Sequence, residues 1–203
     1  RSWPEERNRS PPVNATARTA GSAAASSRAA STSRFMSRLK AFFLSGEYPE
    51  FVCTDYNDQV VTLVDTPVPT SPPNPVDKNL LTYIQGGQAW PIGMNLAGGT
   101  GLFRVCESKT ANMTCWDTDV STQSCTLGPS LLTGTGYDAP PGAGQCTQGG
   151  GTNWLTTIGN VNPGQIVELR FVIWDAGDSI LDSTVLLDDF RWDAQSRTPG
   201  TSG

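Results

Sequence analysis

Acidic side chains gather in two loops, each directly after an apolar run of the chain. One loop spans residues 45–58 and follows 41–44; the other spans residues 175–182 and follows 165–174. Carboxylate, amide and backbone oxygens brought together by a flexible turn are the ligands that Ca²⁺ prefers. We therefore predict that the two loops share one cation. The candidate ligands are the oxygen-bearing side chains of Glu47, Asp55, Asn57, Asp58, Asp175, Asp178 and Asp182.

The same aspartates also have a plainer interpretation. Asp commonly closes turns by accepting hydrogen bonds from nearby backbone N–H groups, and Asp178 and Asp182 fit that role. The spacing is not that of an EF-hand, because the 175–182 segment lacks the bidentate Glu downstream. Both interpretations, a Ca²⁺ site and turn caps, stay open on the sequence alone.

A second acidic pair, Asp188 and Asp189, lies inside the apolar run 183–192. Successive side chains of a strand point to opposite faces, so one of the two carboxylates is expected to point inward. A buried carboxylate needs a cationic partner, and Arg170 or Arg191 is available.

Catalysis has few options in this chain, because it contains no histidine. Ser-His-Asp triads, Cys-His pairs and His-ligated metals are therefore excluded. Paired carboxylates of the glycosidase type remain, with Glu47 and Glu50 as the nearest pair of long acidic side chains. Ion ligation or turn capping explains these residues more simply, so we assign no catalytic residue and expect a protein that is not an enzyme.

Aromatic side chains favour a binding role. Trp90, Trp116 and Tyr137 lie in or beside Gly-rich loops, where an exposed ring can stack on a sugar. Trp116, flanked by two aspartates, is the first candidate for ligand contact. Trp154 lies beside such a loop as well, but Trp154, Trp174 and Trp192 also lie in apolar runs, which favours core positions for these three.

The chain has five cysteines: Cys53, Cys106, Cys115, Cys125 and Cys146. A zinc site is disfavoured because there is neither a C-x-x-C pair nor a histidine. Disulfides that staple long loops are the better interpretation, and they indicate an oxidising compartment. Many pairings are possible. We predict Cys53 with Cys106 and Cys115 with Cys125, which leaves Cys146 free.

Charge divides the chain unevenly. Residues 1–40 carry eight Lys or Arg against two Glu, a net charge of +6, whereas the remainder carries −11. The basic segment is rich in Ser, Ala and Thr and poor in apolar residues, so we predict a disordered arm, with a misread or truncated start as an alternative. Nucleic-acid binding is disfavoured because the arginines are scattered and the rest of the chain is acidic.

The elements that must position these residues are strands. Short apolar runs rich in Val, Ile, Leu, Phe and Trp are bounded by Gly, Pro, Asn and Asp, with almost no helical periodicity. They lie at 41–45, 59–65, 79–84, 101–106, 153–158, 165–174 and 183–192. This pattern predicts an all-β, antiparallel, jelly-roll-like β-sandwich with long disulfide-stapled loops.

No run of about 18 apolar residues is present, so no membrane span is predicted. The first residues also lack the apolar segment of a signal peptide.

Several motifs, taken together, resemble the choice-of-anchor L domain. They are Phe43-Leu-Ser-Gly-Glu-Tyr-Pro-Glu-Phe51, Gly151-Thr-Asn-Trp-Leu155, Val161-Asn-Pro-Gly164 and the run from Trp174-Asp-Ala-Gly-Asp178 to Phe190. The resemblance covers roughly 41–192, and its cysteines resemble those of myxobacterial versions. It implies a β-rich module of bacterial secreted or surface proteins. We accordingly expect a domain at 41–193 and a flexible tail at 194–203.

The sequence thus predicts an extracellular or cell-surface module for adhesion or for binding a glycan or surface polymer, stabilised by Ca²⁺. A structural matrix domain without a small ligand is the alternative. A carboxylate-based glycoside hydrolase comes third.

Overall fold

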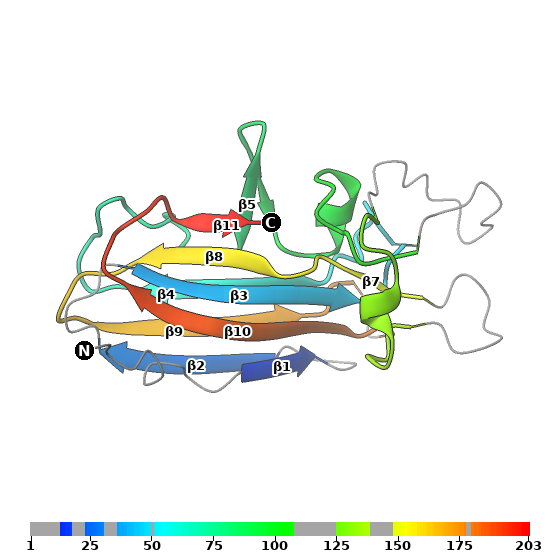
Figure 1. Ribbon diagram of the computed structural model, residues 1–203, viewed down its shortest axis with the longest axis horizontal. Coiled ribbons are helices and arrows are strands. Elements are labelled where there is room, and N and C mark those ends of the chain that lie inside the picture. The colour runs from blue at the N-terminus through cyan, green and yellow to red at the C-terminus, as the bar shows by residue number, and fades with distance from the viewer. Residues whose placement is uncertain are drawn as a thin grey trace, which may run out of the picture.

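The computed structural model describes residues 13–17, 23–30, 36–49, 51–107, 125–138, 148–177 and 180–203. Regular structure in these residues is almost entirely β-strand, in two sheets that pack face to face (Figure 1). The predicted all-β sandwich is therefore confirmed. The helical elements among the described residues are two short 3₁₀ turns, η2 (Met94–Gly98) and η3 (Ser130–Leu132).

The larger sheet has the strand order β1-β10-β3-β8-β11-β5-β6, with β7 beside β3. Its neighbours are antiparallel except for β11 and β5, which are parallel. The strand bounds are β1 Val13–Ala17, β3 Met36–Ser45, β5 Thr82–Gln85, β6 Gln88–Pro91, β7 Gly150–Gly151, β8 Leu155–Asn160, β10 Ser183–Asp193 and β11 Gly200–Ser202.

The smaller sheet is antiparallel and has the order β2-β9-β4. Its strands are β2 (Ala23–Ala30), β9 (Ile166–Trp174) and β4 (Gln59–Asp65). Strands β3, β8 and β10 form one layer, and β9 and β4 lie behind them (Figure 1).

The core lies between the two sheets and follows the two-residue period of the strands. In β9, Val167, Leu169, Phe171 and Ile173 are buried, whereas Ile166 and Arg170 are exposed. In β3, the inward row includes Phe43, which is 0% exposed and meets Phe103 edge to face. The sheets are therefore held together by interdigitating apolar side chains.

A second apolar cluster covers one end of the larger sheet on its outer face. Two residues of β3 pack there against a residue of the loop after η2, the last residue of η3 and a residue of the loop after η3. Its buried members are Phe42, Leu44, Val105, Leu132 and Tyr137. The other end of this outer face carries polar and charged side chains.

In its described part, the segment predicted as a disordered arm, residues 1–40, contains β1, β2 and the start of β3. Strand β1 pairs with β10, β2 pairs with β9, and β3 begins at Met36. The segment is rich in small Ala, Ser and Thr residues and poor in large apolar ones, which is why composition alone indicated disorder. Edge strands can instead be held by backbone hydrogen bonds to a neighbour that is already folded.

The predicted flexible tail at 194–203 is also wrong at its end. Strand β11 pairs with both β8 and β5. Thr201 is buried, and its hydroxyl lies 2.9 Å from that of Thr157 and donates to the Leu80 carbonyl at 2.8 Å. Tertiary pairing orders this short polar segment, which has no apolar pattern of its own.

The predicted disulfide pairing is wrong as well. Cys106 is bonded to Cys125, with their Cα atoms 5.0 Å apart, and Cys53 is an exposed free thiol. Cys53 lies in the loop before β4, where its backbone N–H donates to Asn95 Oδ1. That hydrogen bond places Cys53 against η2 and not beside Cys106. Cys115 and Cys146 lie outside the described residues.

Within the described residues, no helix is both long and apolar enough to cross a membrane.

Phe43→Ala should lower the free energy of unfolding by about 3 to 5 kcal/mol, because it leaves a cavity in the shared core of both sheets. Urea denaturation followed by tryptophan fluorescence measures the change. Ile84→Ala is the matched control, since Ile84 is 59% exposed. Equal effects of the two substitutions would contradict the assigned core.

A peptide map under non-reducing conditions should yield one cross-linked species that contains Cys106 and Cys125 and disappears on reduction. A species that joins Cys53 to Cys106 would show that the loop before β4 packs differently from the structure described here.

Candidate metal centre

The register between β4 and β9 positions two carboxylates at one end of the core. Gln59 pairs with Trp174, and Val60 pairs with Ile173. Continuing the antiparallel ladder by one residue places Asp58 opposite Asp175. Both aspartates share the parity of the buried row that contains Val60 and Ile173, so they point inward where the apolar core ends.

The third carboxylate comes from the other sheet. Glu47 lies in the turn that follows β3, two residues beyond the buried Ser45. Strands β3 and β9 run toward the same end of the sandwich (Figure 1). One carboxylate oxygen from each of Glu47, Asp58 and Asp175 lies within 4.8 Å of the others. The cluster therefore joins the two sheets.

Burial raises the electrostatic cost of this arrangement. Glu47 and Asp58 are each 1% exposed, and Asp175 is half-buried. Like charges directly opposite each other in a ladder destabilise it, and buried carboxylates lose their hydration. Two backbone donors offset part of this cost: Asp58 N–H donates to Glu47 Oε2 at 3.4 Å, and Ala176 N–H donates to Asp58 Oδ1 at 3.1 Å.

The geometry suits a single hard cation. Ca²⁺ binds oxygens at about 2.3 to 2.6 Å, so two ligands on opposite sides of it are about 5 Å apart. Three oxygens within 4.8 Å of one another fit inside that limit. Three carboxylates alone do not complete six to eight ligands; backbone carbonyls and water are the usual complement.

Residues at the start of η2 contact the backbone of Asp58. Met94 N–H donates to the Asp58 carbonyl at 2.9 Å. A Cβ added to Gly93 would lie 2.5 Å from that same carbonyl oxygen, so the close approach requires glycine. Sequence analysis missed Gly93, and no local signal marks it, because the backbone that approaches it lies more than 30 residues away.

Three of the other predicted ligands, Asp55, Asn57 and Asp182, do not join the cluster. Asp55 is exposed. The Asn57 side chain accepts a hydrogen bond from Asn95 N–H at 2.8 Å. Asp182 lies just before β10, where its backbone carbonyl accepts from Gly46 N–H at 3.0 Å. Asp178 lies outside the described residues. Three of the seven predicted ligands thus converge, from the two loops that were expected to share one ion.

Two of the aromatic candidates, Tyr137 and Trp90, are packed against other residues. Tyr137 is 9% exposed, and its hydroxyl lies 2.6 Å from that of Thr184, so its role is packing and not ring stacking on a ligand. Trp90 is half-buried against the core. Its ring fills the space where a Cβ on Gly99 would lie. Trp116 lies outside the described residues.

The turn beside Tyr137 is closed by a carboxylate. Asp138 Oδ2 accepts from Gly134 N–H at 2.9 Å, and this hydrogen bond lowers the pKa of Asp138 below its ordinary value. Asp138 is therefore an ordinary turn-closing aspartate.

The long acidic side chains do not form a described pair across a cleft. Glu47 belongs to the buried cluster, and Glu50 lies outside the described residues. Glu168 accepts from Arg170 Nε at 2.8 Å on the smaller sheet, which raises the pKa of Arg170.

Comparisons of the chain with protein-family models, with curated proteins and with solved structures found no match. The resemblance to the choice-of-anchor L domain therefore stays a hypothesis.

Ca²⁺ should raise the unfolding midpoint of the full chain, because a ligand bound only by the folded state stabilises it. At about 100 times the dissociation constant the gain is about 2.7 kcal/mol. That gain corresponds to roughly 5 to 10 °C for a domain of this size. Calorimetric melts with Ca²⁺ and with a chelator measure it.

Asp58→Asn should abolish this Ca²⁺-dependent rise, whereas Asp55→Asn, a matched change on an exposed loop residue, should preserve it. The rise should also fade at low pH, because ligating carboxylates must be deprotonated. If neither Ca²⁺ nor chelator changes the unfolding midpoint, the three carboxylates are a structural cluster and not a cation site.

Proposed function

We propose that this protein is a Ca²⁺-stabilised β-sandwich module that acts outside the cell or on its surface, in adhesion or carbohydrate binding. The observation that carries the proposal is the buried cluster of Glu47, Asp58 and Asp175, which joins the ends of both sheets. An ion bound there would tie the sheets together and fix the loops that leave them.

Two further features support an extracellular setting. The Cys106–Cys125 disulfide belongs to an oxidising compartment. Extracellular modules commonly bind Ca²⁺ at dissociation constants of about 10⁻⁴ to 10⁻³ M, a range that tolerates a site with few protein carboxylates. A Ca²⁺ site with such dissociation constants is occupied outside the cell and not in the cytosol.

A binding role fits the chemistry better than catalysis does. Without histidine, acid–base work would fall to carboxylates, and Glu47 already belongs to the acidic cluster. We propose a protein that is not an enzyme and whose ligand is a glycan or another surface polymer.

A structural matrix domain is the second candidate, and the β5–β6 hairpin favours it. This hairpin projects from the end of the larger sheet (Figure 1), where β6 is the outermost strand and Ile84 is 59% exposed. Exposed strand edges pair with other chains unless they are blunted.

A glycan array probed with the full chain, with Ca²⁺ and then with chelator, separates these candidates. A sugar-specific signal that chelation weakens supports the Ca²⁺-stabilised binding module. A blank array together with concentration-dependent self-association in sedimentation experiments supports the matrix domain and contradicts the binding role.

A further inference from the structure

The outer face of the larger sheet carries two rows that contain charged side chains, at the end not covered by the second apolar cluster. In one row, Lys40 of β3 pairs with Thr156 of β8 and with Asp188 of β10. In the next row, Arg38 pairs with Ile158 and with Arg191. Side chains alternate along a strand, so these residues point away from the core.

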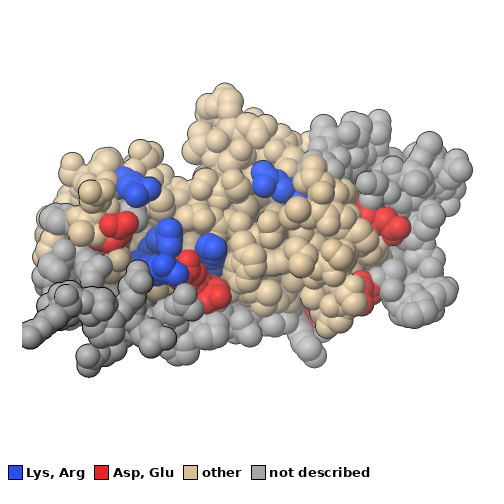
Figure 2. Space-filling view, in the orientation of Figure 1, with Lys and Arg blue, Asp and Glu red and all other residues tan. Residues whose placement is uncertain are grey.

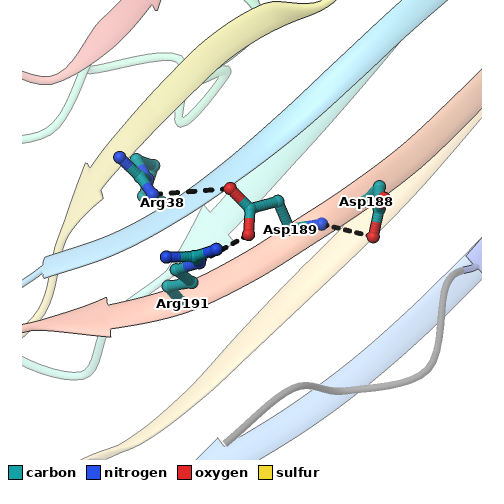
Figure 3. Close-up of polar contacts among 4 residues, drawn as sticks. All are labelled: Arg38, Asp188, Asp189 and Arg191. Carbon is teal, nitrogen blue, oxygen red and sulfur yellow. Dashed lines mark hydrogen bonds and ion pairs between the residues drawn. The ribbon is translucent and has the colours of Figure 1, made fainter. Parts of the chain in front are cut away.

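The two arginines are held in place by one carboxylate. Asp189 accepts from Arg38 Nη2 at 3.4 Å and from Arg191 Nε, and Figure 3 shows its carboxylate between the two guanidinium groups. Each guanidinium has five N–H donors, so most of them stay available. Side-chain exposures of 37% and 46% keep Arg38 and Arg191 accessible to solvent.

A β-bulge brings the Asp189 carboxylate between the two arginines. The ladder between β10 and β3 shifts between Asp188 and Arg191, and Asp189 has φ +54°. Its N–H donates to Asp188 Oδ1 at 2.6 Å (Figure 3). Bulges of this kind turn a side chain to a new direction. The bulge explains why Asp189 reaches Arg191 on the outer face, whereas simple alternation predicted an inward carboxylate.

Lys40 adds a positive charge beside Asp189 and the two arginines. Among the described residues, no ion pair joins Lys40 to an acidic side chain. Figure 2 shows a group of basic and acidic atoms on this face, left of its centre. The group of Arg38, Lys40, Arg191, Asp188 and Asp189 has a net charge of +1, whereas the whole chain carries −5. The face therefore suits an anion of modest charge density.

An exposed aromatic ring lies at the end of the same strip. Trp154 precedes β8 and is 37% exposed, and its ring meets Phe42 edge to face at 5.7 Å. This contact fixes the ring on the outer face, two residues along the strand from the Lys40–Thr156 pair. Four residues of strand separate it from the level of Arg38, roughly 13 Å at about 3.3 Å per residue. The strip is thus longer than one sugar ring.

We propose that this strip binds a glycan that carries carboxylates, such as a uronic acid polymer; the inference rests on the proposed binding function and names its ligand class. Trp154 stacks on a sugar ring, while Lys40 and the arginine pair bind carboxylates. Thr156 and the exposed Ser202, which pair in the β8–β11 ladder, supply hydroxyls for hydrogen bonds. The six residues of the strip are Arg38, Lys40, Trp154, Thr156, Arg191 and Ser202.

The test is calorimetric titration of the full chain with the hexamer of galacturonic acid and with its methyl ester, which has the same rings without the charge. The acid should bind at least about tenfold more tightly than the ester, equivalent to about 1.4 kcal/mol. Trp154→Ala should weaken binding of the acid about tenfold. Lys40→Gln should weaken it several-fold and reduce its dependence on NaCl.

Lys78→Gln is the matched control, because Lys78 is an exposed lysine that pairs with Asp65 away from this face. It should bind the hexamer as the unmodified chain does. Thermal melts verify that each variant is folded, and Trp154→Phe, which keeps a ring, should retain most of the affinity.

Three results would overturn the inference. Equal affinity for acid and ester would remove the role of charge. Equal affinity for a short polyglutamate, unaffected by Trp154→Ala, would indicate a general anion surface. Absence of hexamer binding, despite sugar hits on the array that Lys40→Gln leaves unchanged, would place the ligand elsewhere and leave the proposed function standing. Absence of hexamer binding together with a blank array would reject both this inference and the proposed function.

Discussion

The antiparallel register between β4 and β9 is the constraint on which most of this structure depends. It sets Val60 against Ile173 and Val64 against Leu169 on the buried side. A slip of one residue would send every one of these side chains to the opposite face. The same register carries Asp58 and Asp175 into the continuation of the buried row, so the packing that forms the core also brings these two carboxylates together.

In the larger sheet, strand alternation likewise divides the side chains between the core and the outer face. Alternation in β3 gives Leu39, Ala41 and Phe43 to the core and leaves Arg38 and Lys40 outside. At one end of the strand the outer face is covered by the second apolar cluster, and at the other end it is not. The acidic cluster and the basic strip therefore lie on different parts of one framework.

Much of the architecture could be read from the apolar pattern. The run 165–174 predicts β9 within one residue, and the two acidic loops were correctly expected to meet, because each follows a strand. The segments without an apolar pattern were not predicted as strands. Residues 13–17, 23–30 and 200–202 pair with strands that are distant in sequence, and propensity carries no information about such partners. The disulfide was misassigned for a similar reason, since the position of Cys53 depends on its hydrogen bond to Asn95.

By itself, the sequence determined the fold class, the absence of histidine chemistry and the identity of the acidic loops, because composition and two-residue periodicity are local properties. Only the tertiary structure decided which three of seven oxygen-bearing residues converge and which cysteines bond. It also decided that Trp154 is exposed beside a basic strip and that a bulge turns Asp189 outward. Each of these depends on cross-strand register and on the approach of segments far apart in the chain, which local patterns do not encode.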